Sequence, residues 1–245
     1  MDKIAVLTLS LLLGLVPLLA FGQKPEEDII KTSAGNLKIN FIGHASLVLT
    51  FGDKVIHVDP VTSEGNYKEL PQADLILITH DHYDHFDPAA LKILKKDTTI
   101  IVGPASCQSK VQDLKVMKNG DRLNLLGLDI EAVPAYNLVH KRPDGQPFHP
   151  RGAGNGYVIT FGDKRVYIAG DTENIPEMKN LKNIDIAFLP MNLPYTMTPE
   201  MVAEAARWIK PGILYPYHYG DTNTSRLVTL LKDIPEIEVR IRHMK

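Results

Sequence analysis

Apolar stretches of strand length, separated by turn residues, recur along the chain. Two of them, 46–51 and 157–161, each run into a Gly-Asp turn and then a second apolar stretch that ends on an acidic residue. Two short apolar runs joined by such a turn are typical of a β-hairpin. Similar patterns at 74–78, 129–135 and 185–189 predict further buried strands.

The two hairpins repeat one another in sequence. Residues 50–59 resemble 160–171, with Thr-Phe-Gly-Asp-Lys at the start of both, and the similarity resumes between 74–79 and 185–190. Gly-Asp turns between apolar strands are common, so chance similarity is the alternative to an internal duplication. A duplication makes Asp59 the counterpart of Asp171, and we expect Asp59 to support the loops around it.

Helix signals alternate with these strand signals. Asp-Pro at 87–88 and Thr-Pro at 198–199 are typical of an N-cap and a first helical residue, ahead of predicted helices over 89–96 and 201–209. Alternating strands and helices indicate an α/β protein. A repeated unit of strands followed by a helix predicts two sheets packed face to face, with helices outside.

The first residues are typical of a leader. Lys3 precedes an apolar run over 4–19 that closes on Ala20-Phe21-Gly22, a small-x-small cleavage pattern, so residues 1–22 are predicted to be a signal peptide. A membrane anchor is the alternative, but the run is short for a span. We therefore expect an exported chain, periplasmic or secreted, without a stable membrane anchor after cleavage.

The mature chain is predicted to be one domain. Cleavage leaves about 223 residues, with a lead-in over 23–36 and a single domain over 37–245. The lone Cys107 excludes an internal disulfide and is expected to be a small buried hydrophobic residue. A net charge of −2 gives no indication of a nucleic-acid surface, so no nucleic-acid partner is expected, and the expected partner is a small-molecule substrate.

A histidine-rich cluster directly follows the buried strand at 74–78. It holds four candidate metal ligands in the pattern H-x-H-x-D-H: His80, His82, Asp84 and His85. Neutral imidazole and carboxylate suit zinc, manganese or iron, and ligands at the end of a buried strand can converge on one point. A polar surface loop rich in histidine is the alternative. Asp171 and His218, at the ends of later strands, are the further candidate ligands.

Together these motifs resemble the metallo-β-lactamase superfamily, over about residues 37–218. The opening Phe-Ile-Gly-His-Ala-Ser at 41–46 and the Val-Asp-Pro turn at 58–60 resemble its lactonase-like branch. That branch contains the ascorbate-6-phosphate lactonase, related metal-dependent hydrolases and, more distantly, N-acyl-phosphatidylethanolamine phospholipase D. The resemblance implies a four-layer αββα sandwich of two similar halves with a dinuclear metal site at its edge.

The resemblance also implies which residues hold the two metal ions. His80 and His82 would bind the first ion, and the second would be bound by Asp84, His85 and His218. Asp171 would bridge the two, since adjacent cations need a shared anion to offset their repulsion. Zinc is the expected metal, with manganese or iron as alternatives.

The third imidazole for the first ion is open between two residues. The strand at 129–135 ends in Tyr-Asn at 136–137, where many superfamily members carry their histidine. His140 and His149 follow in an irregular stretch, 137–155, that is predicted to be a loop over the site. We favour His149, because its distance from the strand at 157–161 resembles the usual interval.

A dinuclear centre of this kind implies metal-dependent hydrolysis. A water held between two dications becomes a hydroxide nucleophile near neutral pH, and Asp84 can accept its proton and orient it. The bond attacked would be an ester, lactone, amide or phosphodiester. A non-catalytic metal-binding or scaffolding protein and a β-lactamase are the alternative functions.

Substrate contacts are expected on loops at the metal edge. His44, Asn192 and Tyr195 are the candidates. Lys141, Arg142 and Arg151 could meet an anionic group, although a solvated loop is the better interpretation of these three.

Overall fold

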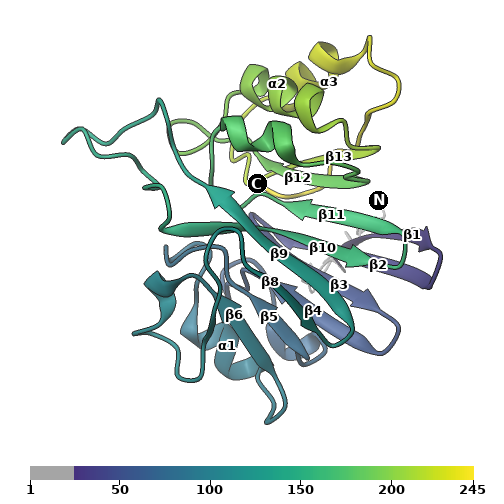
Figure 1. Ribbon diagram of the computed structural model, residues 1–245, viewed down its shortest axis with the longest axis vertical. Coiled ribbons are helices and arrows are strands. Elements are labelled where there is room, and N and C mark those ends of the chain that lie inside the picture. The colour runs from purple at the N-terminus through teal and green to yellow at the C-terminus, as the bar shows by residue number, and fades with distance from the viewer. Residues whose placement is uncertain (1–24) are drawn as a thin grey trace, which may run out of the picture.

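The structure is a computed structural model that describes residues 25–245, and the predicted signal peptide lies outside the described residues. Two seven-stranded mixed sheets pack face to face (Figure 1). The first contains, in spatial order, β1 (Glu26–Thr32), β2 (Gly35–Gly43), β3 (Ser46–Phe51), β4 (Lys54–Val58), β5 (Leu75–Leu77), β6 (Ile100–Gly103) and β7 (Lys115–Val116). The second contains β8 (Arg122–Leu125), β9 (Leu128–Ala135), β10 (Gly154–Phe161), β11 (Lys164–Ile168), β12 (Ile186–Pro190), β13 (Ile213–Tyr217) and β14 (Glu238–Val239).

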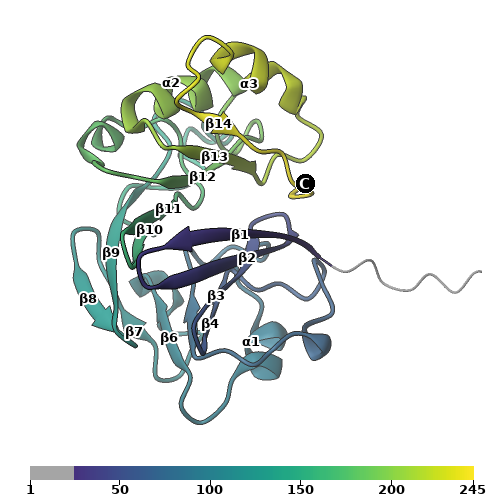
Figure 2. The ribbon, with the colours of Figure 1, turned by 90° about the vertical axis from the view of Figure 1, so that its right-hand side faces the viewer.

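Helices cover the outer faces of the sandwich. Helix α1 (Pro88–Leu94) lies on the first sheet, and α2 (Pro199–Ile209) and α3 (Thr224–Leu231) lie on the second, at the opposite end of the molecule (Figures 1 and 2). Three short 3-10 helices are Tyr67–Glu69, Ala105–Cys107 and Pro176–Asn180. The architecture is the αββα sandwich that the sequence predicted. Among residues 25–245, no helix has the length and apolar character needed to cross a bilayer.

The two halves share one topology. In each, three antiparallel pairings are followed by three parallel ones, so that β1–β7 correspond in order to β8–β14. The hairpin β3–β4 pairs Val48 with His57, and the hairpin β10–β11 pairs Val158 with Tyr167. The sequence repeat therefore corresponds to a repeated fold.

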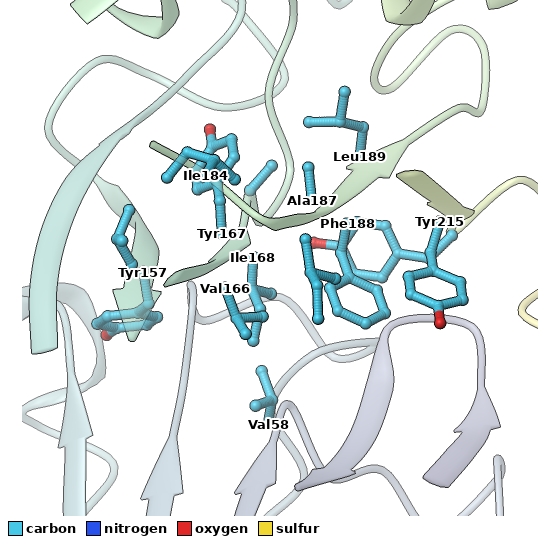
Figure 3. Close-up of a cluster of buried hydrophobic side chains, with 14 of the residues drawn as sticks. Val58, Tyr157, Val166, Tyr167, Ile168, Ile184, Ala187, Phe188, Leu189 and Tyr215 are labelled. Carbon is cyan, nitrogen blue, oxygen red and sulfur yellow. The ribbon is translucent and has the colours of Figure 1, made fainter. Parts of the chain in front are cut away.

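The main core lies between the sheets, because alternate residues of a strand point to opposite faces. Leu75 and Leu77 of β5 face the second sheet, whereas Ile76 and Ile78 pack with α1 in a separate apolar cluster. Figure 3 shows Val58 of the first sheet reaching toward the apolar side chains of the second. Cys107 is buried in the α1 cluster, as expected, and burial raises its pKa to about 12.

Local capping explains where the helices begin. The Asp87 carboxylate accepts a hydrogen bond from the amide of Ala89, and the Thr198 hydroxyl accepts one from Met201. Helix α1 ends at Leu94, two residues before the predicted end at 96. Helix α3 was not predicted, although Asn223 caps it at Ser225.

The predicted lead-in contains strand β1, which pairs with β2 along its whole length. Asp28 of this strand also accepts hydrogen bonds from Arg242, at 2.7 Å, and from Tyr215, which belong to the second half. The start of the described chain and its last residues therefore lie side by side (Figure 2).

Candidate metal centre

The predicted ligands come from loops at one edge of the sandwich. His80 follows β5, Asp171 follows β11 and His218 directly follows β13, while His149 lies shortly before β10. The Gly-Asp pair after β11 has a steric reason. Gly170 has a φ of 65°, and a Cβ there would lie 2.9 Å from the carbonyl oxygen of Asn155. Glycine therefore lets the chain turn so closely that Asp171 enters the cluster.

Asp171 lies at the centre of this cluster. One carboxylate oxygen, Oδ2, is 3.2 Å from Nε2 of His149, 3.3 Å from Nε2 of His218 and 3.9 Å from Nε2 of His80. The other oxygen, Oδ1, is 3.2 Å from Nε2 of His85. Because four imidazoles from three loops point at one buried carboxylate, Asp171 has the position of a shared ligand.

The possible ligand atoms fall into overlapping groups, in each of which the atoms lie within 4.8 Å of one another. One group joins three imidazoles, those of His80, His82 and His149. A second, around Asp84, joins His44, Asp84, His85 and His218. A third joins His80, His85 and Asp171, and so connects the first two. The structure thus places His149 with His80 and His82.

Unpaired polar atoms inside the cluster fit a metal site. Within the described chain, Nε2 of His80, His85 and His218 and Oδ1 of Asp171 are buried and make no hydrogen bond. Unpaired buried nitrogen and oxygen atoms are costly unless something compensates them. The donor set, imidazole with carboxylate, suits zinc, manganese or iron, so these residues fit divalent metal ions.

The first half of the fold fixes the rings of two of these histidines. Asp59 Oδ2 is 2.8 Å from Nδ1 of His85 and accepts a hydrogen bond of 2.6 Å from the Thr79 hydroxyl. Since that hydroxyl donates to Asp59, its oxygen is free to accept from Nδ1 of His80, 3.0 Å away. Nδ1 of each ring is therefore held by a hydrogen-bond partner, and Nε2 faces the cluster.

A similar arrangement holds His149. Asn137 Oδ1 accepts hydrogen bonds from the His149 amide, at 2.8 Å, and from Nδ1 of its ring, at 2.7 Å. Asn137 in turn donates to Glu173 and, at 2.9 Å, to the Tyr195 carbonyl oxygen. His149 is therefore oriented by Asn137, which lies just after strand β9.

Glu173 is a buried carboxylate that the sequence analysis missed. It accepts hydrogen bonds from three consecutive backbone amides, those of Leu138, Val139 and His140, at 2.6–2.7 Å. Burial raises its pKa, but these hydrogen bonds outweigh that effect and the net pKa is lowered. The only sequence signal was a second acid two residues after Asp171. Glu173 anchors the base of the loop that carries His149.

His140, the alternative third ligand, lies outside the groups of possible ligands among the described residues. Its Nδ1 is 2.6 Å from Glu173 Oε1, so the ring belongs to the loop anchor. The loop itself extends away from the body of the protein between β9 and β10 (Figure 1). Strand β10 begins at Gly154, inside the stretch predicted to be loop.

The charges in the cluster are strongly coupled. Burial raises the pKa of Asp171, but nearby His218 and His85 outweigh it and hold that pKa well below its usual range. Burial lowers the pKa of His218, but Asp171 overrides it and raises the value to about 9. Burial, with His85 second, lowers the pKa of His80 well below its usual value. Asp171 is therefore ionised, as a carboxylate that binds a metal ion must be.

The candidate substrate residues lie near the cluster. His44 packs its ring 3.8 Å from that of His218, and its Nε2 is 3.4 Å from Asp84, so its place is within the ligand group itself. Asn192 lies beside Gly220, and Tyr195 is 45% exposed next to Asn137.

The loop cations are differently placed. Arg142 stacks over the Phe148 ring at 5.2 Å and donates to its carbonyl oxygen, and Arg151 pairs with Glu177 at 2.6 Å. Lys141 is exposed. The two arginines therefore bond to groups of the protein, which does not favour a role in holding an anionic group.

Comparison with known proteins agrees with this geometry. A family model described as a beta-lactamase superfamily domain matches residues 38–218. The chain belongs to the metallo-β-lactamase superfamily. Curated relatives named UPF0173 metal-dependent hydrolase include one from Thermococcus kodakarensis, 33% identical over 75% of this chain and 85% of the relative. Another, from Methanopyrus kandleri, is 31% identical over 75% and 84%.

Solved structures show the same superfamily fold. One from Parabacteroides distasonis, described as a candidate metal-dependent hydrolase, has a TM-score of 0.86 and 51% identity, and covers 90% of this chain and 100% of that one. A metallo hydrolase from Ignicoccus hospitalis, at 22% identity and a TM-score of 0.68 over 84% and 94% of the two chains, shares the fold. The chain is thus a metal-dependent hydrolase of this superfamily.

Proposed function

We propose that the protein hydrolyses its substrate with two divalent metal ions held on either side of Asp171. The observation that supports this most strongly is the position of Asp171, whose two oxygens face imidazoles of both ligand groups. The first ion would be held by His80, His82 and His149, and the second by Asp84, His85 and His218. Zinc is the proposed metal, because four-coordinate imidazole and carboxylate sites suit it.

When bound, two such ions would supply a water of lowered pKa and a Lewis acid for the group under attack. The protein's own residues then divide the remaining work. Asp84 has a side chain that is 30% exposed, and its pKa is lowered despite burial because the imidazoles of His218 and His44 lie beside its carboxylate. An ionised carboxylate with access to solvent can accept a proton from the attacking water and orient it.

His44 has the position of a second proton carrier. Its Nδ1 donates to the Lys245 carbonyl oxygen at 3.0 Å, which leaves Nε2 facing Asp84. A ring fixed in this tautomer can take a proton from Asp84 or contact the substrate. The bond hydrolysed is proposed to be that of an ester, lactone, amide or phosphodiester.

A hydrolase screen tests this function. The mature protein, loaded with zinc or manganese, is assayed against lactones, phosphodiesters, acyl amides and β-lactams, with His82→Ala as the inactive variant. His57→Gln is the matched control, since His57 lies in β4 away from the ligand groups. We expect turnover that depends on metal and on His82. Equal turnover by His82→Ala would contradict the proposal.

We also propose that the chain is exported and carries no stable membrane anchor after cleavage, on the basis of the leader pattern in residues 1–22. Expression of the full chain in a bacterial host, followed by fractionation and N-terminal sequencing, tests this. A mature protein that begins at Gln23 in the periplasm or medium is expected. An uncleaved cytoplasmic chain would contradict it.

A further inference from the structure

Exposed apolar side chains are concentrated around the candidate metal centre. The described chain has seven exposed large hydrophobic residues, and five of them lie on the loops that carry or border the ligands. We call these five the apolar rim: Tyr83, Leu138, Val139, Leu193 and Tyr195. Single exposed apolar residues are ordinary, but a group of them around a site needs a reason.

Contacts between the loops show that the rim surrounds one place. The carbonyl oxygen of Tyr195 accepts a hydrogen bond of 2.9 Å from Asn137, the residue before Leu138. The rings of Tyr195 and Phe148 are 5.1 Å apart, and Phe148 is followed directly by His149. The loop after β12 and the loop before β10 therefore meet beside a proposed metal ligand.

Tyr83 brings in the third loop. It lies between His82 and Asp84 and is 86% exposed. The ring of His82 is 4.9 Å from that of His149, so the loop of Tyr83 adjoins the loop of Leu138 and Val139. His82 and Asp84 are themselves only partly buried, which means that the cluster opens toward solvent on the side of Tyr83.

Two of the three cations in the neighbouring loop are engaged within the protein. Arg142 bonds to Phe148 and Arg151 to Glu177, while Lys141 is exposed. Val139, by contrast, is 69% exposed while its backbone amide is held by Glu173. The rim therefore presents apolar side chains on anchored backbone, which reduces the entropy lost when a ligand covers them.

We propose that the substrate carries an apolar group, an alkyl chain or an aromatic ring, which lies on the apolar rim while the bond to be hydrolysed reaches the metal ligands. This rests on the proposed function for the position of that bond. The rim supplies the affinity for the apolar group, and the substrate class becomes apolar esters, lactones or amides.

A ladder of saturated carboxylates tests the proposal by binding alone. Affinities of butanoate, hexanoate and octanoate are measured by calorimetry for the zinc-loaded and the chelator-treated protein. We expect affinity to rise with chain length, by up to about fourfold for each methylene that is fully buried. The increase of affinity with chain length measures the contribution of the apolar rim. The difference in affinity between the zinc-loaded and chelator-treated protein measures the contribution of the metal. The rim proposal and the proposed function can therefore fail independently.

Matched variants locate the slope. Leu138→Ser with Val139→Ser is expected to remove most of the dependence on chain length, and Tyr83→Ser, on another loop, to reduce it. The control is Ile29→Ser with Val228→Ser, which changes the two exposed apolar residues on β1 and α3 and should leave the slope intact. No chain-length dependence in the natural protein, or an equal slope in all variants, would overturn the proposal. The proposal would also be overturned if the protein bound phosphatidylcholine vesicles through the rim residues while carboxylate affinity did not depend on chain length. The rim would then be a membrane-binding surface.

Discussion

The two halves of the molecule place an aspartate at the same edge and use it differently. Asp59 follows β4 and Asp171 follows β11, and both face the ring of His85. Asp59 is 2.8 Å from its Nδ1, and Asp171 is 3.2 Å from its Nε2. One copy of the duplicated hairpin therefore orients a ligand, while the other supplies one. A symmetric scaffold has given rise to an asymmetric site.

The same divergence extends along the hairpins. Asp74 and Asp185 keep one role. Asp74 accepts a hydrogen bond from the backbone amide of Val55 in β4, and Asp185 accepts one from that of Arg165 in β11. His57 and Tyr167, by contrast, occupy equivalent positions in β4 and β11 with different chemistry. The duplicated fold therefore keeps the side chains that hold neighbouring strands together, while other equivalent positions have diverged.

The largest effect is expected for Asp171→Ala. Loss of the shared anion removes several kcal/mol of charge stabilisation, so hydrolysis of a substrate found in the screen should fall by about a thousandfold or more. Initial rates with saturating zinc measure this. Asp163→Ala, in the turn of the same hairpin, is the control and should change the rate little. If the rate of Asp171→Ala stayed within tenfold of that of the natural protein, Asp171 would not differ from Asp59 in being a ligand.

His57 should make the first half sensitive to acid. Burial lowers its pKa to about 4, although its hydrogen bond to the Pro71 carbonyl opposes this, and the usual value is 6.5. As pH falls from 6.5 to 4 the unfolded chain takes up the proton first, so stability present above 6.5 is lost in that window. The loss is about 3 kcal/mol in the free energy of unfolding.

Denaturant unfolding between pH 7 and pH 4 measures this loss. His57→Gln keeps a side-chain donor without the titration, so its stability should fall by about 3 kcal/mol less than that of the natural protein. The metal ligands titrate in both chains and cancel in the difference. If the free energy of unfolding fell equally with pH in the two proteins, His57 would not be the source of acid sensitivity in the first half.

A smaller effect is expected when the orienting residues are changed. Asp59→Asn weakens the hold on His85, and Asn137→Ala removes the acceptor for His149, so each should lower zinc affinity about 10- to 100-fold. Competition with a chromophoric chelator gives these affinities. Glu177→Gln, which lies on the surface beside Arg151, serves as the control. If Asp59→Asn lowered zinc affinity as much as Asp171→Ala does, Asp59 would itself be a ligand.

The smallest effect concerns the role that both halves retain. Asp74→Ala and Asp185→Ala each remove a hydrogen bond to a strand amide, together with a partly exposed contact to a lysine. Each should lower the free energy of unfolding by about 1 kcal/mol. Urea unfolding at pH 7 gives both values. A difference between them of more than about 1 kcal/mol would show that this pair has diverged as well.

The sequence predicts the sandwich well, because its evidence is local. The hairpins were predicted from apolar strands on either side of Gly-Asp turns, and α2 was predicted from Thr-Pro at its start. Strand β1 was not predicted because residues 26–32 include only two apolar side chains, and the strand is fixed by its pairing with β2. Helix α3 is eight residues long and half polar, which left its capping residue Asn223 as a weak signal.

The candidate ligands of the site could be predicted, because histidine and aspartate side chains are typical metal ligands. His80, His82 and His85 stand in a spaced motif, and the structure brings them together with His149, Asp171 and His218. The supporting bonds could not be read in this way. Glu173 holds backbone amides 33–35 residues earlier in the chain, and backbone amides carry no sequence signature.

The stoichiometry of bound metal tests the proposed dinuclear centre most directly. The mature protein and Asp171→Ala are purified without chelator, equilibrated with zinc, dialysed and analysed by mass spectrometry of the element, with folding checked by circular dichroism. Two zinc ions per chain in the natural protein, and one or none in Asp171→Ala, are expected. Fewer than one ion per chain in the natural protein, or two in both, would contradict a pair of metal ions shared across Asp171.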